Sequence, residues 1–355
     1  IYPNVKISIF AKSGGPDDND TPWAQELENF KAEHGTYPSL YASTDLVGDI
    51  SKGLVADLSI FKDDPMYQSF NKSVMAMMNF NGFQGGLPQY LLPWGVFINK
   101  SLAENNNLDV PDPDWTLDEY VDFVSQANNK DFWGAMDVPL SFIETGSKSI
   151  IYQMAKHDGK GDYVNLNGDD VKDLINYIPK MAKSAVWAQN DIGNIPQEVM
   201  DENWWWGFKF FISNKILTLD GDPWMMGDAA HPDPNHWGRV QADDWDIYPR
   251  PATKYQPNTV GVVLDPFAVH NYALDDGNPE LSETEAAQLK LAYTFATFWV
   301  GDTRAVKARA EQKFNDGGVL KTCLNDSFPL VTGDAFKEQM DIWYSVETHQ
   351  RFADK

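Results

Sequence analysis

Aromatic side chains are the residues of this chain whose type and number most clearly suggest chemistry. Phe, Tyr and Trp make up 13% of the 355 residues, and tryptophan alone occurs 13 times. Flat rings with a polar edge stack well on sugars, bases and peptide chains, so this surplus predicts a binding surface as well as a core. Three tryptophans follow one another at positions 204–206, but successive residues of a helix point about 100° apart and cannot all line one site. We favour Trp206, because Phe210 follows it one helical turn later.

Some other residues could ligate metals or act as nucleophiles, but their spacing does not favour these functions. His231 and His236 lie in a loop restricted by two prolines, with no third ligand placed to join them. The acidic residues 109–114 lack the glycine and the spacing of a calcium loop, whereas an exposed calcium site at residues 17–20 stays open. Cys323 is the single cysteine, which excludes an intrachain disulfide and a cysteine-based zinc site. We therefore expect no catalytic residue, no metal and no cofactor.

The charge of the chain restricts its partners. Lys and Arg number 28 and Asp and Glu number 52, which gives a formal net charge of −24 at pH 7. A surface this acidic repels phosphate backbones and anionic lipids, so we expect no nucleic-acid partner. The densest apolar stretch, residues 289–300, is shorter than the ~20 residues that a membrane-spanning helix needs. We therefore expect no membrane span.

The elements that must position these side chains alternate between strand and helix patterns. Strands are predicted for residues 6–10, 39–42 and 94–99, and helices for residues 23–34 and 45–52. Strands that alternate with helices are typical of an α/β domain. We expect its sheet to be largely parallel.

Two capping boxes mark the starts of further helices. Thr116 with Glu119, and Ser282 with Glu285, have the spacing that satisfies free backbone N–H groups at a helix start. The first helix is expected to extend to residue 126 and the second to about residue 300. Because the second helix is apolar on nearly all sides, we expect it to be buried.

Several segments, taken together and in order, resemble a known family. They are residues 38–44 with 52–58, residues 94–100 with 113–119, residues 213–224, and residues 244–251 with 260–264. These segments resemble the extracellular solute-binding proteins of ABC importers, in the family typified by maltose- and oligosaccharide-binding proteins. Residues 213–224, for example, are similar to that family's G-K-x-A-M-x-x-x-G-x-W motif. The resemblances keep the order of the family and cover most of the chain.

For the fold, the resemblance implies two α/β lobes of the periplasmic-binding-protein-like kind, with a ligand cleft between the lobes and hinge crossings. The two lobes would hold residues 1–93 with 260–301, and residues 94–259 with 302–355. One strand–helix unit of the usual N-terminal lobe is expected to be missing from this numbering. The crossings are expected at three places, near residues 92–94, 254–259 and 300–303.

In the first lobe, the resemblance implies ligand contacts around the end of the strand at residues 39–42. Tyr41 would offer an aromatic face to the ligand. Ser43, Thr44 and Asp45 would exchange hydrogen bonds with ligand hydroxyls, as hydroxyl and carboxylate groups can. Asp265 follows a strand of the same lobe and is also expected to reach the ligand.

In the second lobe, Trp224 is the leading candidate for stacking on a sugar, because it matches the tryptophan of the motif above. Trp343 and Tyr344 resemble an aromatic stretch that contacts ligand in maltose-binding relatives. Trp343 also belongs to an apolar helical stripe, so a packing role for it stays open. Phe328, on the loop before that helix, is a further candidate.

The function implied by the resemblance is that of the substrate-binding component of an ABC transporter. It would capture a neutral oligosaccharide by hinge closure, with aromatic stacking and hydrogen bonds and without catalysis. Two alternatives stay open. The first is a glycan-active enzyme of the glycosidase type, because the chain has many carboxylates, and the second is a receptor for a non-sugar solute.

The resemblance also implies a partner and a location. The partner would be the membrane permease of the importer, and the protein itself is expected to be a monomer. It would act outside the cell as a lipoprotein anchored upstream of Ile1, as in Gram-positive bacteria, or in the periplasm. The sequence opens without a basic or apolar leader, so a targeting segment is expected to have been removed or left out of the numbering.

Overall fold

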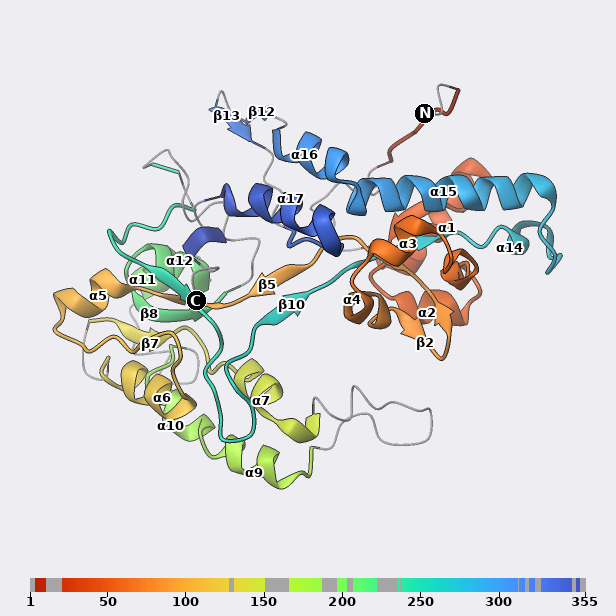
Figure 1. The fold of residues 1–355 in the computed structure, drawn as a ribbon. Coiled ribbons are helices and arrows are strands. Elements are labelled where there is room, and N and C mark those ends of the chain that lie inside the picture. The colour runs from red at the N-terminus through yellow and green to blue at the C-terminus, as the bar shows by residue number, and fades with distance from the viewer. Residues whose placement is uncertain are drawn as a thin grey trace. The chain divides into compact units, whose positions relative to one another are not determined.

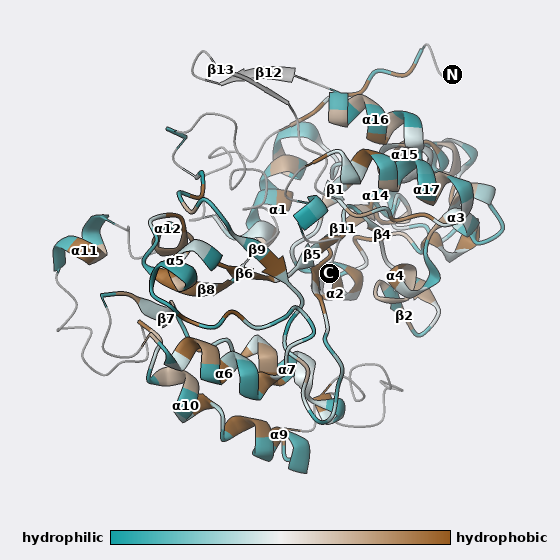
Figure 2. Cartoon of the chain, turned by 60° about the vertical axis from the view of Figure 1, so that its left-hand side comes forward, coloured by the Kyte–Doolittle hydropathy of each residue, from teal (hydrophilic) through white to brown (hydrophobic). Residues whose placement is uncertain are grey.

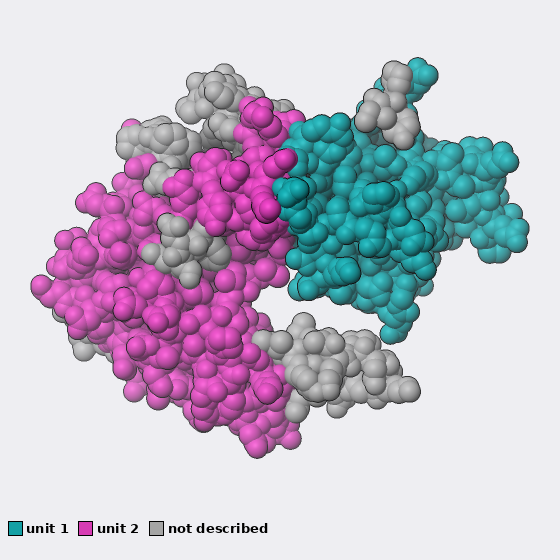
Figure 3. Space-filling view, in the orientation of Figure 1, with its two compact units in different colours: residues 1–90, 264–306, 330–335 teal, residues 91–263, 307–329, 336–355 magenta. Residues whose placement is uncertain are grey.

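The computed structural model describes residues 4–10, 21–127, 131–150, 166–186, 197–202, 207–221, 235–236, 238–311, 313–316, 319–322, 327–346 and 349–351. The chain divides into two compact units, which Figure 3 shows in different colours. Unit 1 comprises residues 1–90, 264–306 and 330–335, and unit 2 comprises residues 91–263, 307–329 and 336–355. The lobe boundaries expected from the sequence stay a prediction, because compactness does not define which segments move as one body.

Unit 1 combines a small sheet with several short helices and one long helix (Figure 1). Its strands are β1 (Leu40–Ala42), β2 (Asn79–Phe80), β3 (Phe83–Gln84), β4 (Leu87–Pro88) and β11 (Pro266–Val269). Its helices are α1 (Trp23–His34), α2 (Leu46–Ser51), η1 (Leu58–Phe61), α3 (Pro65–Ser69), α4 (Lys72–Ala76), α14 (Ala273–Asp276) and α15 (Glu283–Gly301). Helices α16 (Thr303–Glu311) and α17 (Gly333–Tyr344) each begin in unit 1 and end in unit 2.

The main sheet of unit 1 has the strand order β1-β11-β4. Both neighbouring pairs are antiparallel, so the prediction of a largely parallel sheet is wrong for this unit. The physical reason is that β11 comes from a distant part of the chain. It enters between β1 and β4 and runs against both of them.

Helix α1 has the predicted bounds, and its end shows why the sequence stops it there. Gly35 adopts a left-handed φ of 80° and donates its N–H to the carbonyl of Lys31, a conformation that glycine reaches without steric cost. On the buried side of the helix, Leu27 lies in a core cluster that includes Tyr37 and Leu54.

Residues 4–10 form no strand, so the strand predicted for residues 6–10 is wrong. Ile7 and Ile9 are 55% and 91% exposed, while the ring of Phe10 lies 5.1 Å from that of Phe30 in α1. Alternating polarity produces a strand only where a neighbouring strand supplies the ladder of hydrogen bonds. No described strand pairs with this segment.

Helix α15 begins at the predicted capping box, in which Ser282 and Glu285 each accept the backbone N–H of the other. Its burial differs from the prediction. Tyr293 is 1% exposed, whereas Phe298 and Trp299 are 39% and 40% exposed, so the helix is covered on one side only. No helix among the described residues is long and apolar enough to cross a membrane.

Unit 2 contains a four-stranded sheet with the order β7-β8-β6-β9 and a two-stranded ribbon of β5 and β10. The strands are β5 (Leu92–Trp94), β6 (Val96–Ile98), β7 (Trp133–Ala135), β8 (Ile216–Asp220), β9 (Asp246–Tyr248) and β10 (Gly261–Val263), with the hairpin β12 (Lys313–Asp316) and β13 (Val319–Thr322). The helices are α5 (Lys100–Asn105), α6 (Leu117–Ser125), α7 (Ser141–Gly146), α9 (Asp169–Ile175), α10 (Ile178–Ala182), α11 (Gln197–Glu202) and α12 (Gly207–Ile212). Only the β7–β8 pair of this sheet is parallel, so the predicted parallel character is wrong here too, because β6 runs against both of its neighbours.

The sheet of unit 2 carries different core clusters on its two faces. Phe97 pairs with Leu219 of β8 and Ile247 of β9, and all three side chains belong to one buried cluster. The adjacent Val96 and its partner Tyr248 belong to a second cluster. This division follows from the two-residue period of a strand, which sends successive side chains to opposite faces.

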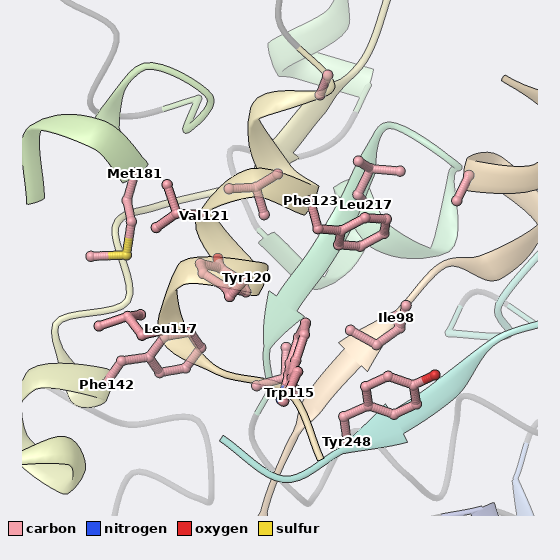
Figure 4. Close-up of a cluster of buried hydrophobic side chains, with 14 of the residues drawn as sticks. Ile98, Trp115, Leu117, Tyr120, Val121, Phe123, Phe142, Met181, Leu217 and Tyr248 are labelled. Atoms are coloured by element: carbon pink, nitrogen blue, oxygen red, sulfur yellow. The ribbon is translucent and has the colours of Figure 1, made fainter. Parts of the chain in front are cut away.

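Aromatic rings fill much of the second cluster (Figure 4). The ring of Trp115 lies edge-on at 5.5 Å from Tyr120 and at 5.4 Å from Tyr248, and Tyr120 lies 4.9 Å from Phe142. Helix α6, which begins at the predicted cap Thr116, carries hydrophobic and hydrophilic residues on different sides (Figure 2). Part of the aromatic surplus is therefore explained by packing.

Candidate ligand-binding residues

The end of β1 in unit 1 carries polar contacts that organise the start of α2. The Ser43 hydroxyl donates to the Asp49 carboxylate at 2.7 Å and accepts from the backbone N–H of Asp45 at 3.2 Å. The Asp45 carboxylate in turn accepts the N–H of Gly48 at 3.0 Å and so caps the helix. Ser43 is buried, whereas Thr44 and Asp45 are exposed. Thr44 and Asp45 are thus the residues of this turn that a ligand could reach directly.

Backbone hydrogen bonds place Asp265 beside the same end of β1. The N–H of Ser43 donates to the carbonyl of Pro266 at 3.0 Å, and the N–H of Gln89 donates to the carbonyl of Asp265 at 2.8 Å. The carboxylate of Asp265 accepts a hydrogen bond from the Tyr90 hydroxyl. The structure therefore brings together the predicted residues Ser43 and Asp265, which lie far apart in the sequence.

Tyr41 lies in the core of unit 1. It is 7% exposed, and its ring centroid lies 5.8 Å from that of Trp23. Its hydroxyl is buried without a well-oriented hydrogen-bond partner. Burial, and then the nearby Asp49 carboxylate, raise the pKa of this hydroxyl. A sugar could stack on Tyr41 only if the packing around the ring opened, so its position favours a packing role.

The candidates of unit 2 fall into two groups. Trp206 and Trp224 lie outside the described residues. Trp343 is 1% exposed and stacks on His349 with a centroid distance of 4.4 Å, while the ring of Phe328 lies edge-on to it at 5.4 Å. Packing, the alternative left open for Trp343, is therefore the observed arrangement, and Tyr344 beside it is 40% exposed.

A charged cluster at the end of β8 was missed by the sequence reasoning. The Arg250 guanidinium donates through Nε and Nη2 to the two carboxylate oxygens of Asp220, each at 3.2 Å. The side chains of Arg250 and Asp220 are only 7% and 14% exposed. The Ser141 hydroxyl donates to the same carboxylate. Burial raises the pKa of Asp220, although Arg250, Ser141 and Trp94 each act to lower it.

Strand register explains why these residues meet. Val96 of β6 pairs with Asp220 on one side and with Tyr248 on the other. Trp94 lies two residues before Val96 and Arg250 two residues after Tyr248. This spacing places side chains of extended chain on one face, here the face of Asp220. The guanidinium carbon of Arg250 is 5.6 Å from the centroid of the Trp94 ring.

A signal for this cluster was present in the sequence. Trp94, Asp220 and Arg250 each fall in a segment that carries the family resemblance, at residues 94–100, 213–224 and 244–251. The missing step was the pairing of these segments, because a one-residue change of register would send the side chains to opposite faces.

No group of three or more His, Cys, Asp or Glu side chains in the described part of the chain is arranged to hold a metal ion. That part includes the acidic residues 109–114 and His236. His231, Cys323 and the open calcium candidate at residues 17–20 lie outside the described residues.

Comparisons with known proteins give matches in structure alone. No protein-family model matches the chain, and no curated protein matches it. An ABC substrate-binding protein from Listeria monocytogenes, solved in complex with cycloalternan, is similar with a TM-score of 0.60 at 16% identity, over 94% of this chain and 76% of the other. A cyclo/maltodextrin-binding protein complexed with maltotetraose is similar with a TM-score of 0.59 at 16% identity, over 93% and 73%. A sugar transporter from Rhizobium etli in an open conformation gives 0.55 at 16%, over 94% and 84%.

These likenesses identify the fold. Each covers nearly all of this chain, at sequence identities too low to transfer a ligand or a binding residue. The chain has the mixed α/β, two-lobe periplasmic-binding-protein-like fold that the sequence predicted, although its described sheets are mainly antiparallel.

Proposed function

We propose that the chain is the substrate-binding component of an ABC transporter and that it captures a neutral oligosaccharide by hinge closure, without turning it over. The observation that carries this proposal is the likeness in fold, over more than nine-tenths of the chain, to proteins solved with cycloalternan and with maltotetraose. A fold hosts many functions, so the residues must also suit the ligand.

The exposed polar groups of unit 1 suit a ligand rich in hydroxyls. Thr44 and Asp45 stand at the end of β1, close to the Tyr90–Asp265 pair. Hydroxyl and carboxylate oxygens accept hydrogen bonds from sugar hydroxyls, and a hydroxyl can also donate. We propose that Thr44, Asp45 and Asp265 contact the sugar directly and that Ser43 holds this turn in place.

Aromatic contacts are proposed for unit 2. Trp224 follows β8 by four residues in the sequence, and we retain it as a stacking residue. The exposed Tyr344 is a second candidate, while Phe328 and Trp343 are proposed to support the ligand-binding residues of this unit through packing, as is Tyr41 in unit 1. For Trp206, ligand contact rests on the sequence argument alone.

A glycan-active enzyme and a receptor for another solute are the competing functions. A glycosidase needs two carboxyl groups about 5–10 Å apart, one of them with a raised pKa. The pKa of Asp220 is raised, but its carboxylate is already bonded to Arg250 and Ser141. A buried ion pair of this kind favours a structural role over proton transfer.

A calorimetric panel separates the three functions. The unaltered chain is titrated with maltotetraose, cycloalternan and the polyol ribitol, and each mixture is then incubated and analysed by chromatography. Saturable binding heat with an oligosaccharide, and recovery of that sugar unchanged, are expected. Release of a shorter sugar would favour an enzyme, and heat with ribitol alone would favour a receptor for smaller solutes.

We further propose that the protein works outside the cytoplasmic membrane with a membrane permease as its partner. The support is again the fold, which it shares with substrate-binding proteins of ABC transporters. A monomeric state and lipid anchoring upstream of Ile1 stay predictions. Light scattering on the purified chain tests the first, and metabolic labelling of the native protein with a radioactive fatty acid tests the second.

A further inference from the structure

Trp94 differs from the tryptophans of the core in how it is held. It lies in β5 and is half-buried. Its indole N–H is buried and makes no well-oriented hydrogen bond, although it lies near enough to the Asp220 carboxylate to lower the pKa of that group. In contrast, Trp115 is 1% exposed and donates its N–H to the carbonyl of Pro249 at 2.8 Å. Trp94 is therefore partly accessible, whereas its buried donor faces Asp220 with incomplete bonding.

The Trp94 ring is supported by a rigid polar cluster. Arg250 lies over the ring, and Asp220 fixes both ends of the Arg250 fork. The backbone leaves room for this arrangement, because Gly261 is the partner of Trp94 in the β5–β10 ribbon. A Cβ atom on Gly261 would stand 2.5 Å from Nη1 of Arg250. A side chain at this position would displace the guanidinium that supports the ring.

The charge of the cluster indicates which ligands it suits. The fork of Arg250 is occupied by Asp220, so it is not free to recognise a ligand carboxylate or phosphate through the same two donors. The two charges compensate each other, and the Trp94 N–H is buried beside Asp220, so what remains for a ligand is the accessible apolar part of the indole. An apolar ring surface beside compensated charges matches a neutral sugar ring, which has an apolar C–H face.

We propose that Trp94 is a carbohydrate contact of unit 2, and that Arg250 and Asp220 are positioning residues that hold its ring. This inference rests on the oligosaccharide-binding function proposed above. It extends that function to a residue that the sequence placed in a hinge crossing. The buried Trp94 N–H faces the Asp220 carboxylate, so this donor helps to orient the ring while the accessible part of the indole is left for the ligand.

The test compares Trp94→Ala and Trp94→Phe with the unaltered chain in calorimetric binding of maltotetraose, or of the panel sugar that the unaltered chain binds most tightly. Removing a central aromatic contact is expected to weaken binding more than about tenfold. The phenylalanine variant keeps a ring but loses the width of the indole and the N–H that faces Asp220, and should weaken binding roughly three- to tenfold. Trp115→Phe is the matched control, and it is expected to lower the melting temperature and to leave the affinity unchanged.

The positioning role has its own readout. Arg250→Lys keeps the positive charge but loses the two-donor fork, so the ligand-induced change in tryptophan fluorescence should shrink together with the affinity. Folded Trp94→Phe protein with unchanged affinity would overturn the inference and leave the proposed function standing. An unaltered chain that binds no panel sugar would overturn the proposed function, and the inference with it. If Arg250→Lys kept the full ligand-induced fluorescence change while the Trp94 variants lost affinity, the positioning role of Arg250 alone would be wrong.

Discussion

The polar ends of the two sheets are built in different ways. In unit 1, Ser43, Asp45 and Asp49 bond to one another within a single short stretch of the chain. In unit 2, Asp220 and Arg250 come from two separate segments and meet only because β6 pairs with both β8 and β9. The first set leaves exposed groups at a helix start, and the second buries its charges almost completely.

This difference indicates which polar groups could bind a ligand and which could support other side chains. Short-range polar contacts can form on a surface, where their outer atoms stay free for a ligand. A buried ion pair has lost its water, and it stabilises a fold only when both partners are present and well oriented. We therefore propose direct ligand contact for the exposed residues of unit 1, and support of a neighbouring ring for the buried pair of unit 2.

The largest expected effect is on the stability of unit 2. Asp220→Ala leaves the guanidinium of Arg250 buried without its partner, and breaking such a pair typically lowers the free energy of unfolding by about 3–5 kcal/mol. The control is Asp173→Ala, because the Asp173–Lys254 pair is 41% and 64% exposed, and exposed pairs contribute about 0–1 kcal/mol. Urea unfolding followed by tryptophan fluorescence measures both. Equal, small losses would show that burial does not distinguish the two pairs.

The next effect concerns ligand affinity. Trp224→Ala should weaken sugar binding by about 2 kcal/mol or more, because aromatic anchors at the centre of a binding site carry much of the affinity. Calorimetry and thermal melting on this one variant separate recognition from packing. If Trp224 were a core residue, melting would reveal a stability loss of about 3–5 kcal/mol with near-normal affinity.

A loss of stability of about the same size is expected when acid protonates a second buried carboxylate of unit 2. Asp170 is 6% exposed. Burial opposes its ionisation, but hydrogen bonds from Ser149 and Ser147 outweigh burial and lower its pKa to about 2. The folded value lies below the unfolded value of about 3.9, so ionised Asp170 stabilises the fold by roughly 2 kcal/mol above that pH.

This stabilisation should be lost as the pH falls from about 4 towards 2. The measurement is the melting temperature against pH for the unaltered chain and for Asp170→Asn, which should differ at neutral pH and converge in acid. Parallel curves would contradict the assignment. Asp220 is the contrasting case. Its pKa is raised, so its contribution to the free energy of unfolding should change with pH in the opposite direction.

The smallest effects belong to unit 1. Asp45→Ala removes the cap of α2 and should lower the free energy of unfolding by about 1 kcal/mol. Thr44→Ala removes an exposed hydroxyl and should change it by less than about 0.5 kcal/mol. Both variants are nevertheless expected to weaken sugar binding. Loss of stability without loss of affinity in Asp45→Ala would mean that the carboxylate only caps the helix.

Local signals in the sequence predicted much of the fold. The bounds of α1, the capping boxes before α6 and α15, and the α/β class follow from residues that are close together in the chain. Gly35 ends its helix for a reason that neighbours cannot override, since its φ is positive. The family resemblance added the two-lobe fold, which local patterns alone do not specify.

The predictions that were wrong concern features that depend on strands distant in the sequence. The alternation of residues 6–10 gave no strand because no described strand pairs with it, and the direction of β11 relative to β1 could not be read from either segment. The candidate residues divide in the same way. Ser43 and Asp45 lie in one turn and could be found from the sequence, whereas Trp94, Asp220 and Arg250 required the register of β6 with β8 and β9.

Oligosaccharide capture without catalysis is tested most directly by calorimetric titration of the unaltered chain with maltotetraose and cycloalternan, followed by chromatography of the recovered sugar. We predict saturable heat with at least one of the two and full recovery of the intact ligand after long incubation. Binding to neither, or steady conversion of the bound sugar to a shorter product, would contradict the central claim that this chain captures an oligosaccharide without catalysis.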